Sequence, residues 1–177
     1  MENNKTEKMN PTRQLVYAAV FIALSFVGAN IKIMGSIAFD SLPAFISVLV
    51  LGAPWGFAIG FLAHILTAAT SGFPLTLPVH LINGVMMGVT MVAFYWSVKL
   101  LLDHHVNSIV AYVVGCVVAV IFNVPIALLA TSPLMTFKVA MALVPVLIPA
   151  AFANVIIACV IYRFLPKRMQ RLTPPGK

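Results

Sequence analysis

Charged side chains are scarce in this sequence. Of its 177 residues only 8% are Asp, Glu, Lys or Arg, whereas 62% are hydrophobic. So few ionisable groups cannot solvate the surface of a globular domain of this size, which excludes a soluble fold. Apolar runs recur from Leu15 to Leu165, too many for one removable signal peptide. The chain is therefore predicted to be a single integral membrane domain.

Residues that carry catalysis, bind metals or hold nucleotides are equally sparse. Beyond the first ten residues the only acids are Asp40 and Asp103, too few for an acid/base or metal-assisted reaction. No glycine-rich loop could cradle a phosphate, so any ATP-driven work needs partner subunits. Cys116 and Cys159 lie in apolar runs without metal-ligand spacing. Neither a cofactor nor a metal site is expected, and no charged ring of a channel is present.

Six membrane-spanning helices are predicted from the apolar runs and the polar segments between them. The expected spans are Arg13–Ala29, a second that includes Leu42–Leu51, Trp55–Ala69, Leu77–Leu102, Ser108–Ala130 and about Pro149–Leu165. The second run is too short to cross a core of ~30 Å alone and must borrow residues from the mixed segment before it. Gly52, Ala53 and Pro54 are expected to form a tight turn after it.

The last span is predicted to begin late because prolines interrupt the region before it. Pro133, Pro145 and Pro149 argue against one straight helix that starts at Phe137. Proline removes a backbone hydrogen bond and its ring clashes with the preceding turn. A short helix or loop is expected there instead.

The chain is expected to have three parts, with both ends in the cytoplasm. Residues 1–12 would form a flexible tail, residues 13–165 the six-helix domain and residues 166–177 a basic tail. An even number of spans puts both ends on one side, where most cations collect: Lys5, Lys8, Arg13, Lys99, Arg163, Lys167, Arg168, Arg171 and Lys177. Only Lys32 and Lys138 lie on the other side. The net charge of +7 thus reflects membrane topology rather than a nucleic-acid surface.

Small residues at four-residue spacing indicate helix faces that pack closely. Ala19 and Ala23 share one face of the first span, and a second stripe contains Gly56, Gly60, His64 and Ala68. In lipid such stripes let backbones approach one another. Taken alone, they are explained by ordinary packing within the bundle.

Polar side chains inside the apolar spans indicate a binding site. They are His64, His80, Asn83, Asn123 and Asn154, and each needs a partner because an unpaired polar group in lipid is costly. His80, Asn83 and Gly84 share a helical face that Met87 and Met91 continue with an adaptable apolar wall. Several polar groups at one depth predict a ligand pocket open to the outside, although interhelical hydrogen bonds would satisfy the same residues. Lys32, Asp40 and Lys138 are candidates for an outer lid, or are simply solvated loop charges.

Over nearly its whole length the chain resembles the substrate-binding S components of energy-coupling-factor (ECF) vitamin transporters. The stretch TRQLVYAAVFIALSFVG is similar to the family's first helix, and the segment from LPAFISVLVLGAPWGF through HLING to its second to fourth helices. PAAFANVIIACVIYR is similar to its last helix. The resemblance implies that Ala19 and Ala23 contact a membrane coupling subunit and that Asn154 lies near the bound vitamin. It also implies two partner ATPases that drive release, in a multi-pass protein of the bacterial plasma membrane.

The pattern from His64 through SGFPLTLPVHLIN most resembles members assigned to cobalamin precursors, α-ribazole in particular. The dimethylbenzimidazole ring of that ligand is expected to lie against Phe39, Phe73 and the methionines, while ribose hydroxyls meet His80, Asn83 or Asn154. Riboflavin, thiamine or a queuosine precursor would fit the same residues. A membrane enzyme acting on a lipid or isoprenoid and a scaffold without a ligand are alternatives of other classes, the first disfavoured by the shortage of acids.

Overall fold

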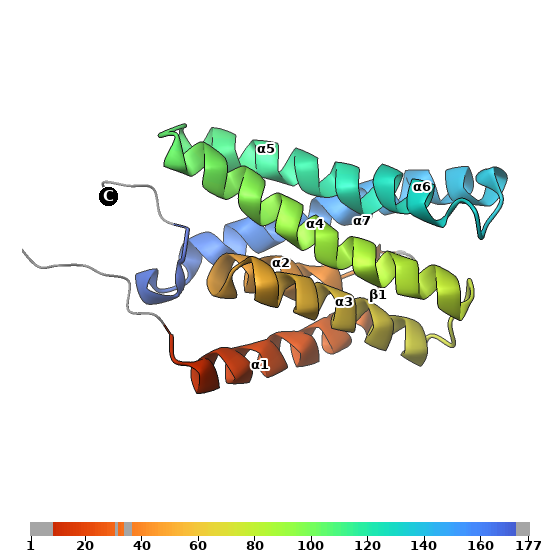
Figure 1. Cartoon of the computed structure of the whole chain (residues 1–177), viewed down its shortest axis with the longest axis horizontal. Helices are drawn as coiled ribbons and strands as arrows, with labels where there is room; N and C mark the ends of the chain where they lie inside the picture. Colours follow the sequence, from red (N-terminus) through yellow and green to blue (C-terminus); the bar gives the residue numbers. More distant parts are fainter. Residues whose placement is uncertain (1–8, 31, 34–36, 173–177) are drawn as a thin grey trace, which may run out of the picture.

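The structure, a computed structural model, describes residues 9–30, 32–33 and 37–172, which form a bundle of helices with one short hairpin (Figure 1). The helices are α1 (Pro11–Asn30), α2 (Ser41–Leu51), α3 (Ala53–Thr70), α4 (Leu77–Asp103), α5 (Ser108–Ile121), α6 (Ala127–Thr131) and α7 (Phe137–Phe164). A π-helical turn, η1 (Phe122–Ile126), joins α5 to α6, and a 3-10 turn, η2 (Lys167–Met169), follows α7. The strands β1 (Lys32–Ile33) and β2 (Ile37–Ala38) pair antiparallel.

Five helical stretches of the described chain are long and apolar enough to cross a membrane: α1, α3, α4, α5 through α6, and α7. They contain 18 to 28 residues, which at ~1.5 Å per residue is enough for a core of ~30 Å. Together with the shorter α2 they make the predicted all-helical bundle. The start of α1 and the end of α7 lie at the same end of the bundle (Figure 1). Lys5, Lys8 and Lys177, which contribute to the predicted charge bias, lie outside the described residues.

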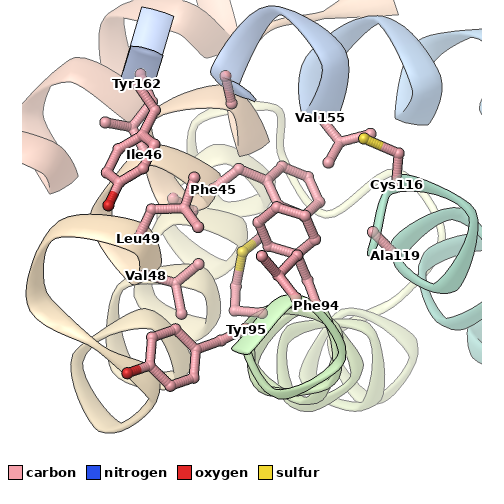
Figure 2. Packing of buried hydrophobic residues seen from close by; sticks show 14 of the residues in the cluster. Phe45, Ile46, Val48, Leu49, Phe94, Tyr95, Cys116, Ala119, Val155 and Tyr162 are labelled. Carbon is pink, nitrogen blue, oxygen red and sulfur yellow. The ribbon is translucent and has the colours of Figure 1, made fainter. Parts of the chain in front are cut away.

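Helix α2 lies at the centre of the bundle. All of its residues except Leu42 are buried, and it packs against α1, α3, α4 and α7. The ring of Phe45 meets Phe94 of α4 edge-on, with ring centroids 5.4 Å apart. Figure 2 shows these two rings in the cluster that Val155 of α7 and Ala119 of α5 also join. A helix that is apolar on every side is stable where protein surrounds it.

The prediction that the second span borrows residues from the preceding segment is wrong. Helix α2 begins at Ser41, whose backbone N–H donates to the Asp40 carboxylate at 2.9 Å, and the chain before it forms the hairpin. Because other helices enclose α2, it does not have to cross lipid alone, and irregular backbone is tolerated where protein surrounds it. The chain turns after α2 as predicted, but it does so at Gly52 alone, because Ala53 and Pro54 already belong to α3. Gly52 has a φ of 96°, a conformation that favours glycine.

The prediction of a late last span is also wrong. Helix α7 runs without interruption from Phe137, with Pro145 and Pro149 inside it. The two prolines are four residues apart and therefore lie on one helical face, and both are exposed. Their rings point away from the bundle, so they do not disturb its packing. Pro133 lies in the loop between α6 and α7, as expected.

The helix predicted over residues 108–130 is present, but it contains a wider turn. Pro125 has no N–H with which to continue the α-helical hydrogen bonds, and η1 surrounds it. Such π-helical turns bend a helix and frequently occur at functional sites. Asn123 belongs to this turn.

The two predicted stripes of small residues lie in different environments. On α3, a Cβ atom at Gly56 would overlap Val48 of α2, and one at Gly60 would lie 3.0 Å from Met91 of α4. This stripe therefore packs within the bundle. Ala19 and Ala23 lie on the exposed face of α1, where no described residue covers them.

The segment after α7 folds back onto the bundle. Arg171 donates from Nη1 to the carbonyl of Leu51 at 2.6 Å, which satisfies the C-terminal end of α2. The backbone N–H of Leu172 donates to the Tyr162 hydroxyl at 2.9 Å, and the Tyr112 hydroxyl donates to the Leu172 carbonyl at 3.3 Å. The basic tail predicted from residue 166 is thus docked as far as Leu172.

Candidate functional site

A cavity of about 280 Å³ opens between the beginning of α2 and the helices around it. Residues of α2, α3, α4, η1, α6 and α7 line it together with three residues from the segments between helices, Asp40, Leu75 and Met135. The helical residues of the lining are Ser41, His64, His80, Asn83, Met87, Asn123, Val124, Ala127, Leu128, Leu143, Leu147, Ala150, Ala151 and Asn154. The volume is close to the lower end of the range of small-molecule sites, roughly 300–1,000 Å³. Its lining combines apolar walls with a few polar groups, as such sites do.

The shortness of α2 sets the depth of this cavity. Eleven residues at ~1.5 Å each extend about 16 Å, roughly half of a ~30 Å hydrocarbon core. Helix α2 begins at the cavity and ends at Leu51, and Gly52, which follows it, lies beside Arg171 of the docked C-terminal segment. The cavity therefore lies in the half of the bundle opposite the two ends of the described chain.

Six of the eight predicted substrate-binding residues line this one cavity. His64 comes from α3, His80, Asn83 and Met87 from α4, Asn123 from η1 and Asn154 from α7. Their positions span 90 residues of sequence, between 64 and 154. The fold brings together the polar groups that the sequence places in separate apolar spans.

The two predicted aromatic residues are not part of the lining. Phe39 lies beside the end of α1, where its backbone N–H donates to the Gly28 carbonyl at 3.1 Å. Phe73 has a positive φ of 49°, and its ring centroid lies 5.8 Å from that of His80. Phe73 therefore supports His80 from the loop before α4. The expectation that both rings form the wall of the pocket does not match the lining; Met87, Leu143 and Leu147 supply apolar surface there.

His64 and His80 form a pair at the wall of the cavity. Nδ1 of His80 lies 3.4 Å from Nε2 of His64, and the ring centroids are 5.5 Å apart. In a hydrogen bond between two imidazoles one nitrogen donates its N–H and the other accepts, so one of the two rings must supply the proton of this bond. His80 is only 7% exposed, and its Nε2 has no hydrogen-bond partner among the described residues. The pair fixes the orientation of both rings.

The three asparagines differ in their burial and in the hydrogen bonds of their side chains. Asn154 is 2% exposed and donates from Nδ2 to the Ala150 carbonyl at 2.9 Å, so it is held within α7. Asn83 and Asn123 are half-buried, and within the described residues neither amide has a side-chain hydrogen bond. Buried amides of this kind are normally paired. Both are free to bond to a ligand in the cavity.

Asp40 and Ser41 line the cavity although the sequence reading did not assign them to the site. The sequence suggests an outer lid or a solvated loop position for Asp40 and gives no indication of a role for Ser41. They reach the interior because α2 starts about halfway through the bundle. The signal in the sequence was an acid directly before a short apolar run, which is an N-cap pattern. Lys138 is exposed in the first turn of α7 and does not line the cavity, and Lys32, the remaining lid candidate, belongs to β1.

The family model of the ECF transporter substrate-specific component matches residues 13–165. The chain belongs to this family. It is thus a multi-pass membrane protein and the substrate-binding subunit of a transporter, whose family implies a small-molecule substrate and an energising module as partner. No curated protein and no solved structure shows significant similarity to the chain.

Proposed function

We propose that this protein captures a flat, uncharged vitamin or vitamin precursor outside a bacterial cell and that α-ribazole, the nucleoside precursor of cobalamin, is its substrate. The observation that carries the proposal is the cavity in which imidazole and amide groups from α3, α4, η1 and α7 and the carboxyl group of Asp40 face apolar walls. A site with a few convergent polar groups and a larger apolar surface binds a ligand of the same composition.

The chemistry of the lining supports a nucleoside. Met87, Leu143 and Leu147 offer a deformable apolar surface for a heterocyclic ring. Asn83 can both donate and accept hydrogen bonds, as sugar hydroxyls and ring nitrogens require. Asp40 adds a carboxyl group, which in other nucleotide-binding sites accepts hydrogen bonds from ribose hydroxyls. The scarcity of charged groups in the lining also disfavours strongly anionic substrates such as folate.

The position of the cavity supports capture from the outside. It lies in the half of the bundle away from the end where the described cations gather, and positive residues collect on the cytoplasmic side. Ala19 and Ala23 lie on the exposed face of α1 and not at the cavity. We propose this face as the contact with the coupling subunit, through which two ATPases would drive release. The binding and coupling surfaces are thus separate and can be altered independently.

Titration calorimetry of the purified protein against α-ribazole, cobalamin, riboflavin, thiamine, biotin and a queuosine precursor tests the proposal. Saturable one-to-one binding of α-ribazole, with weak or no binding of the others, is the expected result. Tight binding of riboflavin, thiamine or the queuosine precursor instead would retain the transport role and replace the substrate. Silence across the panel by protein shown to be folded would favour a scaffold.

A further inference from the structure

A second cavity, separate from the substrate cavity, opens between α5 and α7 at the end of the bundle where the described chain begins and ends. It has a volume of about 630 Å³ and shares no lining residue with the substrate cavity. Its walls are apolar and come from both helices: Ile109, Val113, Val117, Phe152, Ile156 and Val160. We call it the α5–α7 groove.

The groove faces the lipid. Val113, Val117, Ile156 and Val160 are between 45% and 57% exposed in the isolated bundle, and both helices are long and apolar enough to cross the membrane. An acyl chain can therefore enter the groove sideways from the bilayer, and the apolar side chains already favour contact with hydrocarbon over water.

Cations mark the cytoplasmic end of the same groove. Arg163, in the last turn of α7, and Lys167, in η2, both line it. The described carboxylates lie elsewhere: Asp103 is paired with Lys99, and Asp40 lines the substrate cavity. Among the described residues no acid pairs with Arg163 or Lys167. Their charge therefore remains available for a ligand.

The start of α5 adds to this positive potential. Ser108, the first residue of α5, lines the groove close to where that helix emerges. Helix N-termini carry partial positive charge and expose backbone N–H groups. Basic pockets between membrane helices on the cytoplasmic side are suited to anionic lipid headgroups.

We infer that the α5–α7 groove binds an anionic phospholipid of the inner leaflet, with its phosphate at Arg163 and Lys167 and an acyl chain along Val113, Val117 and Ile156. The positive charges of Arg163 and Lys167 favour an anionic lipid in the groove over a zwitterionic one. The bound lipid would tie α7 and the docked C-terminal segment to the inner leaflet. The site is independent of the substrate that the outer cavity takes.

Native mass spectrometry of the full-length protein tests this inference. The detergent-purified protein is titrated with dioleoyl phosphatidylglycerol and, separately, with dioleoyl phosphatidylcholine. We expect phosphatidylglycerol to bind preferentially, and the double variant Arg163→Gln, Lys167→Gln to lose about 30-fold in affinity for it, which is about 2 kcal/mol for two cations. Arg168→Gln is the matched control, because Arg168 lies in the same turn but does not line the groove. It should change the affinity less than about twofold.

A second pair of variants tests the apolar part of the groove. Val117→Trp should fill the groove and weaken phosphatidylglycerol binding, whereas Val85→Trp, at an equally exposed valine of α4, should not. Equal binding of both lipids, or equal losses in the Arg163/Lys167 variant and in Arg168→Gln, would overturn the inference. Displacement of the lipid by soluble glycerol phosphate would show a phosphate site and would also overturn it.

Discussion

Asn83→Ala is the substitution whose effect follows most directly from the structure. The Asn83 amide lines the cavity, is half-buried and has no side-chain hydrogen bond with the described residues. Its truncation therefore removes hydrogen bonds to a ligand without breaking one within the protein. A ligand group left unpaired in a buried site costs ~1–3 kcal/mol, which is about a 5- to 140-fold increase in Kd.

Titration calorimetry of wild type and variant with α-ribazole measures this increase. The thermal unfolding temperature without ligand should change little, because substitutions away from packed or hydrogen-bonded positions alter stability by roughly 0.5 kcal/mol or less. Asn30→Ala is the matched control: this exposed asparagine at the end of α1 bonds to the Phe26 carbonyl and does not line the cavity. An unchanged Kd for Asn83→Ala, or an equal loss for Asn30→Ala, would refute the assignment of the amide to the ligand.

Three further predictions concern the cavity, the exposed face of α1 and the packing of α5 on α7. Asp40→Asn keeps an oxygen for the N–H of Ser41 but replaces the second carboxyl oxygen by an NH2 group, which cannot accept a hydrogen bond from a hydroxyl. Calorimetry should therefore show about a tenfold weaker affinity for a hydroxyl-bearing ligand with little change in thermal stability, and unchanged affinity would place the ligand elsewhere. Ala19→Trp or Ala23→Trp should abolish co-purification with the coupling subunit and leave ligand affinity intact, and loss of ligand binding would contradict this separation. The Sγ atoms of Cys116 and Cys159 lie 3.8 Å apart on different helices, so mild oxidation should join them in an intramolecular disulfide. Mass spectrometry would detect this bond because both thiols would be protected from alkylation. Two alkylated thiols would contradict the register of α5 and α7.

Much of the fold could be predicted because lipid imposes simple rules. The polar turn after Leu102 separates two apolar runs long enough to span a bilayer, and Gly52 separates the short α2 from α3; helices end at both places. The sequence does not predict the continuity of α7, because proline normally interrupts a helix, whereas membrane-spanning helices tolerate it where nearby groups satisfy the backbone carbonyls that it leaves unpaired. The sequence does not show that Pro145 and Pro149 share an exposed face.

The candidate site was predictable in part for a related reason. Polar groups in apolar spans have few permissible locations, so His64, Asn123 and Asn154 could be assigned to a common interior before the helices were arranged. Asp40 was missed because its depth depends on α2 being short and enclosed, a property of the packing rather than of its local sequence. Phe73 was misplaced because a loop residue with positive φ directs its ring in a way that helical spacing does not predict.

The most direct test of the account is calorimetric titration of α-ribazole into the wild-type protein, whose cavity is open, and into a variant in which a tryptophan fills the cavity. Leu147→Trp adds volume at a lining residue, and Val146→Trp adds it at the neighbouring, exposed residue of α7. The account predicts one-to-one binding to wild type and to Val146→Trp, and loss of binding to Leu147→Trp while that variant remains folded. Wild-type affinity in Leu147→Trp would show that the ligand binds outside this cavity and would contradict the account.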